Sequence, residues 1–325
     1  MDAGKRTRIK LSLCEEIFPY CYAFGVAVTL CSKRKRTMKN TQQQRILTIG
    51  LGAMGAVLAR LLTEKGEKVT VWNRSEAKAK PLTAIGATYT ADIAKAVAEN
   101  DIILICLLDY VATEQVLAGV SLEGKTIVQL STGTPQDARL MAAAFSARGA
   151  WYLDGAILAT PSQMGTEQTP IFLSGSPQAW AGAEAALRIL GGTLIYLGEA
   201  PGAASAWDIA ALSSMFGMMI GFLNGARIIE SEGMRVTDLG TMIRDIAPVL
   251  GQMIKDTGDD IEQKKYDSPQ SSLDICAGTF DLIVRLSAEN KLDDGFATFA
   301  QRLFRKGLDA GYGQERISAL MKTLR

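Results

Sequence analysis

A single acid, Asp208, interrupts an otherwise apolar run and is the first candidate for acid–base chemistry in this chain. The run is APGAASAWDIAAL, residues 200–212, and it has no Lys or Arg within four positions of the acid. Burial among Ala, Trp and Met side chains would raise the pKa of Asp208 above its reference of about 3.9, which suits a proton donor. An ionised Asp208 would bind a cation instead. The structural alternatives are a helix cap or an ion pair with a distant Arg.

Composition narrows the remaining chemistry. The 325 residues include no histidine, which excludes Ser-His-Asp and Cys-His catalysis and His-ligated metal. Acid–base work therefore falls to Asp, Glu, Lys, Tyr or Cys, and we predict no metal site. Lys and Arg total 35 against 34 acids, a balance that argues against a nucleic-acid partner. The five cysteines form no CxxC pair, so we expect a reducing, cytoplasmic setting.

The motif GLGAMG, residues 50–55, predicts a dinucleotide site. It lies between a β-rich run at 45–49 and a helical pattern that ends at Gly66, and a second strand is expected at 68–72. Strand, glycine turn, helix and strand form the context that GxGxxG requires. Gly50 allows the tight turn, Gly52 lets the backbone approach the pyrophosphate, and Gly55 permits close packing of helix and strand. With the phosphates on the helix N-terminus, the expected contacts are Gly50, Leu51, Gly52, Ala53, Met54 and Gly55.

The end of the second strand favours NADPH over NADH. An NAD enzyme usually places Asp or Glu there to hold the ribose hydroxyls, whereas this chain has Asn73, Arg74 and Ser75. Arg74 can grip a 2′-phosphate, helped by Lys78 one turn later. The alternative is a surface arginine in a turn. Three residues at the carboxyl ends of later strands complete the predicted cofactor contacts: Leu107, Leu108 and Thr132.

The fold class is α/β, with an all-α C-terminal part. Further strands are expected at 101–108, 126–130, 151–158, 169–175 and 193–198, and ligands of such sheets lie beyond the carboxyl ends of the strands. No strand pattern recurs after 203. Helices are expected at 203–233, 236–254, 277–291 and 293–311, with a cap from Thr237 or Asp238.

Four segments follow from these patterns. Residues 45–202 form a Rossmann NADPH-binding domain, 203–233 an interdomain helix, and 234–325 a helical domain for dimerisation and substrate binding. Residues 1–44 are a disordered extension or non-native start. Their apolar run at 17–31 has 15 residues, whereas a membrane span needs about 20; a weak anchor is the alternative.

The expected helix at 203–233 is apolar on nearly every face, which requires burial, and a second subunit can provide it. Met215, Met218 and Met219 are expected in a core or a dimer interface. Met215 can also face substrate, and Trp207 and Thr160 are expected to line the same pocket.

The order of these segments resembles the β-hydroxyacid dehydrogenase superfamily, whose opening motif GLGAMG matches closely. That superfamily continues with a DAPVSGG-like substrate loop and a GxGxxxKxxxN helix. This chain has DGAILAT at 154–160, and aligning Gly202 with the first glycine of the helix motif places Asp208 on the lysine and Leu212 on the asparagine.

The chain lacks this lysine and asparagine, and in this it resembles the imine reductases. They are a branch of that superfamily with Asp or Tyr in place of the Lys. VWNRS, STGTPQDAR, DGAILATPSQMG and WDIAAL look like that branch. The resemblance covers about residue 45 to the C-terminus. It implies NADPH-dependent reduction of cyclic imines or iminium ions, and homodimers with interlocked, domain-swapped helical domains. Neither nucleic acid nor a membrane is expected as a partner.

The residue types fit that chemistry, because an iminium accepts hydride more readily than a neutral imine and a carboxylate favours the cation. Lysine at the same place would repel it. Two alternatives remain: a dehydrogenase of a small 3-hydroxy acid or another carbonyl, and a non-catalytic dimer that binds NADPH.

Overall fold

The computed structural model describes residues 44–267 and 269–324. The predictions for 1–43 lie outside the described residues. The chain divides into two compact units, and the boundary along the sequence lies between Ala211 and Leu212.

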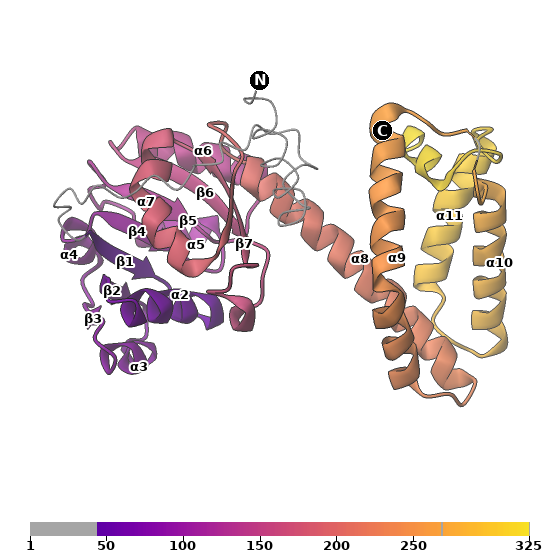
Figure 1. Ribbon diagram of the computed structural model, residues 1–325, viewed down its shortest axis with the longest axis horizontal. Coiled ribbons are helices and arrows are strands. Elements are labelled where there is room, and N and C mark those ends of the chain that lie inside the picture. Colours follow the sequence, from indigo (N-terminus) through magenta and orange to yellow (C-terminus); the bar gives the residue numbers. More distant parts are fainter. Residues whose placement is uncertain (1–43, 268, 325) are drawn as a thin grey trace, which may run out of the picture. The chain divides into compact units, whose positions relative to one another are not determined.

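The first unit is built on an eight-stranded sheet in the order β3-β2-β1-β4-β5-β6-β7-β8, in which only the β6–β7 pair is antiparallel (Figure 1). The first six strands have the order of a dinucleotide-binding sheet, as the α/β prediction required. The strands are β1 (Arg45–Ile49), β2 (Lys68–Trp72), β3 (Thr88–Tyr89), β4 (Ile102–Ile105), β5 (Thr126–Gln129), β6 (Trp151–Ile157), β7 (Pro170–Gly175) and β8 (Thr193–Tyr196).

Helices cover both faces of this sheet, so its strands are apolar on both sides. One core joins the sheet to α2, α3 and α7, and a second core joins it to α4, α5 and α6. The helices of this layer arrangement are α2 (Ala53–Glu64), α3 (Lys80–Thr83), α4 (Ile93–Ala98), α5 (Tyr110–Val116), α6 (Pro135–Ser146) and α7 (Pro177–Leu190), with short helical turns η1 (Glu76–Lys78) and η2 (Pro161–Gln163).

Strand β4 is shorter than its apolar pattern predicted. It ends at Ile105, and the N–H of Leu107 donates to Oγ of Ser131 at 2.9 Å instead of to a neighbouring strand. The predicted end of α2 is confirmed: Gly66 has φ of +84°, and its N–H donates to the carbonyl of Thr63. Such a left-handed residue closes a helix.

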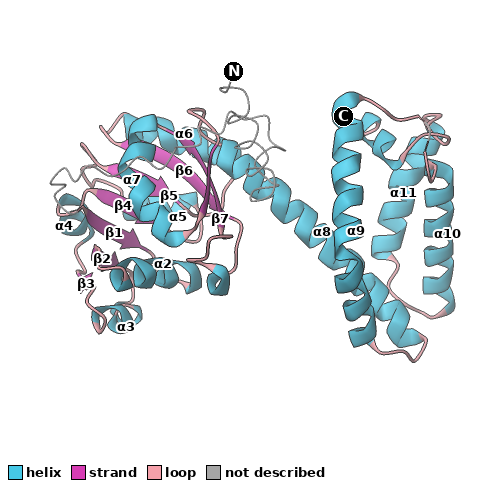
Figure 2. Cartoon of the chain, in the orientation of Figure 1, coloured by secondary structure: helices cyan, strands magenta, loops and turns pink. Residues whose placement is uncertain are grey.

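The second unit contains helices only, apart from one isolated bridge between Ser272 and Arg316, within residues 212–267 and 269–324 (Figure 2). Its elements are the rest of α8 (Ala203–Ser231), α9 (Val236–Gln263), α10 (Leu273–Glu289), α11 (Gly295–Asp309) and the turn η3 (Ile317–Lys322). A core of Leu273, Ala277 and Phe304 joins α10 to α11. The predicted cap of α9 is wrong: Arg235 is the N-cap residue, and Thr237 and Asp238 lie inside the first turn.

Helix α8 is long and apolar enough, by length and composition, to span a membrane. Its described buried residues are Ala204, Ser205 and Asp208. Most of its apolar surface is therefore uncovered in the single chain, so the chain alone does not supply the burial that its composition predicts.

Candidate active site

The glycine turn has the shape that a dinucleotide requires. Gly50 has φ of +97°, and a Cβ there would lie 2.3 Å from the carbonyl oxygen of Cys106. A Cβ on Gly55 would lie 2.0 Å from the carbonyl oxygen of Gly50, so strand and helix meet at backbone distance. Gly52 differs, because nothing lies within 4 Å of its Cβ position. No side chain caps α2 there, and its N-terminus faces the space that a pyrophosphate would fill.

Asn73 supports this turn through its side chain. Its Oδ1 accepts from the N–H of Leu51 at 3.1 Å, and its Nδ2 donates to the carbonyl of Ser75 at 3.0 Å. The amide therefore fixes the loop that carries the cofactor residues. Arg74, Ser75 and Lys78 are exposed beside it, at the place where a 2′-phosphate is expected.

The other predicted cofactor residues follow β4 and β5. Leu108 is 86% exposed, which suits an apolar wall for a ring that covers it. Thr132 is also exposed. Because β1, β4 and β5 are parallel neighbours, their carboxyl ends share one edge of the sheet, and these residues lie at the edge that carries the glycine turn.

Thr132 connects that edge to the candidate acid. Its side chain hydrogen-bonds the carboxyl of Asp208, a residue that is 7% exposed. Burial raises the pKa of Asp208; the Thr132 hydrogen bond opposes this, and the charge of Asp154 adds to it. No ion pair of Asp208 is found among the described residues, and it lies in the second turn of α8 rather than at its cap. Both structural alternatives for this acid are therefore excluded within the described chain.

The first turn of α8 rests on a cross-strand pair of β6 and β7. Asp154 and Ser174 are directly opposite in that register, and both side chains accept from N–H groups of the helix. Ser174 Oγ accepts from Ala204 at 3.0 Å, and Asp154 Oδ2 accepts from Ser205 at 3.0 Å. The helix start is thus capped from the sheet.

Asp154 is a buried acid that was expected on the strand at 151–158 and at the start of the DGAILAT segment, but was not predicted as a site residue. It is fully buried, and Oδ1 also accepts from the hydroxyl of Tyr110 at 2.7 Å. Burial raises its pKa, while hydrogen bonds from Tyr110, Ser205 and Gly202 oppose the shift. An acid inside the otherwise apolar strand WYLDGAIL was the signal that could have identified it.

The three predicted substrate residues have different surroundings. Trp207 is 40% exposed and stacks on Phe172, with ring centroids 5.5 Å apart. Thr160 is the N-cap residue of the turn η2, and its N–H and its hydroxyl donate to Gln163 Oε1 at 2.8 and 3.0 Å. Met215, which is 44% exposed, belongs to the second unit. Substrate contact by each of them stays a prediction.

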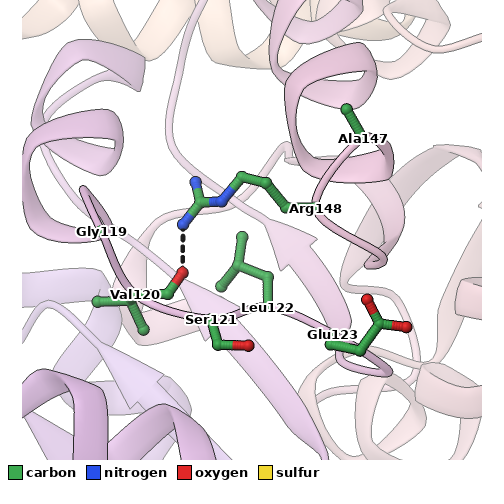
Figure 3. A pocket seen from close by; sticks show the side chains of 7 residues that line it. All are labelled: Gly119, Val120, Ser121, Leu122, Glu123, Ala147 and Arg148. Carbon is green, nitrogen blue, oxygen red and sulfur yellow. Dashed lines mark hydrogen bonds between the residues drawn. The ribbon is translucent and has the colours of Figure 1, made fainter.

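A separate hollow lies away from these residues (Figure 3). Gly119–Glu123, Ala147 and Arg148 line it, just before β5 and β6 begin and therefore at the amino ends of those strands. The guanidinium of Arg148 donates to the carbonyls of Leu117 and Val120 at 2.7 and 2.6 Å. This arginine fastens the loop through its Nη2 group.

Comparisons with known proteins agree with this geometry. Residues 45–198 match the NAD-binding domain of 6-phosphogluconate dehydrogenase, and residues 200–325 match the C-terminal domain of the NADPH-dependent reductive aminase-like family. The chain is 34% identical to an NADPH-dependent reductive aminase of Aspergillus oryzae over 84% of this chain and 94% of that one.

Solved structures of imine reductases and reductive aminases are also similar to this chain. An imine reductase of Myxococcus stipitatus in complex with NADP+ superposes with a TM-score of 0.83 at 32% identity, covering 86% of this chain and all of the other. A reductive aminase of Aspergillus terreus, in complex with NADPH4, cyclohexanone and allyl amine, gives 0.82 at 34% identity over 87% of this chain and all of the other. These likenesses extend through the glycine turn and α8, and the chain belongs to the family of NADPH-dependent imine reductases and reductive aminases.

Proposed function

We propose that this chain reduces cyclic imines or iminium ions to amines with NADPH, with Asp208 as proton donor or iminium anchor. The observation that supports it is the buried Asp208, joined through Thr132 to the sheet edge that carries the glycine turn. Two relatives that are 34% and 32% identical to this chain are a reductive aminase and an imine reductase. The residues of the turn fit the cofactor, because Gly52 opens onto free space at an uncapped helix N-terminus.

Bound NADPH would supply the hydride that reaches the imine carbon. The chain's own part concerns the nitrogen. With its pKa raised by burial, a protonated Asp208 can transfer its proton to the imine nitrogen. An ionised Asp208 would stabilise the iminium by its charge. Thr132 restricts the carboxyl in both cases.

The alternative substrate, a 3-hydroxy acid, fits less well. Its carboxylate would approach Asp208, and Asp154 already adds negative charge there. Like charges at a buried site are costly. A silent NADPH-binding dimer is the other alternative, and turnover separates it from an enzyme.

The test is to compare Asp208→Asn with the wild type on 1-pyrroline and 3,4-dihydroisoquinoline, following NADPH consumption. Asn keeps the size of the side chain and a hydrogen-bonding group toward Thr132, but it has no acidic proton to transfer and no negative charge. We expect kcat to fall by about 10²–10⁴-fold, the usual contribution of a general acid, with NADPH affinity unchanged. Glu184→Gln is the matched control, because it removes a carboxylate from a surface pair with Arg188 on α7. Unchanged turnover by Asp208→Asn would disprove its role, and a wild type inactive on every cyclic imine but active on 3-hydroxy acids would disprove the reaction.

We also propose that a second copy of this chain covers α8, as a domain-swapped homodimer in the cytoplasm. Between Asp208 and Arg227 the helix has no charged residue, and Met218 and Leu223 are each 60% exposed. On α9, Val249 and Met253 are exposed by 62% and 59%. Apolar surface on this scale requires a partner. The first turn of α8 is hydrogen-bonded to polar side chains of β6 and β7, which favours a protein rather than a lipid as that partner.

Sedimentation in detergent-free buffer tests this proposal. We expect a dimer for the wild type and a folded monomer, or weaker dimer, for Leu223→Lys. Glu232→Lys, at an exposed polar position just after α8, is the control and is expected to remain dimeric. A monomeric wild type, or one that stays soluble only with detergent, would contradict it.

A further inference from the structure

We propose that Asp154 is a positioning residue for Asp208: it fixes the first turn of α8 on the sheet and places a negative charge behind the catalytic carboxyl. This inference rests on the proposed function of Asp208. Asp154 itself is fully buried.

The anchoring follows from the hydrogen bonds around Asp154. Oδ2 accepts from the N–H and the hydroxyl of Ser205 at 3.0 and 2.9 Å. Oδ1 accepts from the Tyr110 hydroxyl at 2.7 Å, and the N–H of Gly202 also donates to this carboxyl. One side chain on β6 thereby connects α5, the residue before α8 and the first turn of α8.

Asp208 follows Ser205 by three residues, which places it one turn along the same helix and on a neighbouring part of its surface. A shift of the first turn would therefore move the Asp208 carboxyl relative to Thr132 and the sheet edge. The stack of Trp207 on Phe172 and the bond from Ala204 to Ser174 support the same turn. These contacts fix the backbone, but they carry no charge.

The donor set favours an ionised Asp154. Two of its partners are backbone N–H groups, which donate and cannot accept, and the positive end of the α8 dipole points at it. Burial acts in the opposite direction and raises its pKa. The partners that bind it in the described chain, Tyr110, Ser205 and Gly202, are neutral, so its charge is not cancelled by a cation among them.

The titratable groups that face Asp154 come from three elements: Tyr110 on α5, Tyr152 on β6 and Asp208 on α8. Burial keeps both tyrosines neutral by raising their pKa values. Asp208 is then the group that responds, and the charge of Asp154 keeps its proton bound to a higher pH.

The experiment measures the titration of Asp208 without relying on turnover. The carboxyl carbon of Asp208 is followed by NMR in ¹³C-aspartate-labelled protein with NADP+ bound, and its signal is assigned by its loss in Asp208→Asn. In Asp154→Asn the midpoint should move to lower pH. The alkaline limb of kcat should move the same way if Asp208 donates the proton, and kcat at neutral pH should fall by about 10²-fold, the effect of a misplacement of about 1 Å.

Ser174→Ala is the matched control, since it removes the acceptor of the Ala204 N–H without changing charge. It should loosen α8 without lowering the Asp208 midpoint, because the charge of Asp154 remains and any weakening of the Thr132 hydrogen bond would raise that midpoint. Asp154→Ser is a second neutral variant, whose hydroxyl is an N-cap acceptor that favours folding. The titration midpoint of Asp208 should fall in this variant as well. An unchanged or higher midpoint in whichever Asp154 variant folds would overturn the inference, as would an equal shift in Ser174→Ala. A wild type that reduces no imine would refute the proposed function alone, because the midpoints would still report on Asp154.

Discussion

Replacement of Gly52 by Ala should separate cofactor binding from folding. The backbone at Gly52 has φ of −70° and ψ of −174°, which alanine adopts without strain. A Cβ there meets nothing within 4 Å. The remaining cost is that of alanine at an N-cap, about 1 kcal/mol or less, so the melting temperature should fall by no more than about 2–4 °C.

NADPH binding should respond much more. The added methyl group enters the space in front of the α2 N-terminus, where the pyrophosphate is expected. Moving the phosphates by the width of a methyl group weakens their N–H contacts. A loss of about 1.4 kcal/mol, or tenfold in Kd, is a conservative expectation. Fluorescence titration of NADPH and a thermal scan of the same sample measure both effects.

Gly55→Ala is the contrasting variant. Its Cβ would lie 2.0 Å from the carbonyl oxygen of Gly50, and backbone must move to accept it. Alanine gains about 1 kcal/mol of helix propensity, whereas overpacking costs about 1–3 kcal/mol or more, so this variant should be the less stable of the two. Normal NADPH affinity in Gly52→Ala would refute the assignment of that space to the cofactor.

Two further variants test the remaining electrostatics. Arg74→Ala should weaken NADPH far more than NADH in parallel titrations, because only NADPH carries the 2′-phosphate; equal losses would show that Arg74 is an ordinary surface residue. Asp208→Asn should gain stability relative to the wild type as the pH rises from about 4 to about 7. The folded-state pKa of Asp208 is raised, so its contribution to stability is present at low pH and is lost as the pH rises through that folded value. Thermal unfolding across this range measures it, and a constant difference between the two proteins would contradict the burial argument.

Local patterns were sufficient for the nucleotide-binding half of the molecule. The strands at 45–49 and 68–72 have the bounds that their β-rich runs predicted. GLGAMG lies between them, where Gly50 and Gly55 are required by contacts of backbone with backbone. Such short-range constraints are readable in sequence because the residues that impose them are neighbours in the chain. The lone acid in WDIAAL could be selected for the same reason, since its apolar context is local.

Pairings between distant segments were decided only by the tertiary structure. Thr132 was predicted to hold the cofactor, yet its side chain hydrogen-bonds Asp208, 76 residues later. Asp154 was expected on the strand at 151–158, but only the antiparallel register of β6 and β7 placed it beside Ser174, under the first turn of α8. The apolar strand around this acid indicated its burial, but its donors could not be read from local sequence, because Tyr110 and Ser205 are 44 and 51 residues away. The sequence by itself therefore singled out the candidate acid, and the packing of α8 on the sheet determined which groups surround that acid and shift its pKa.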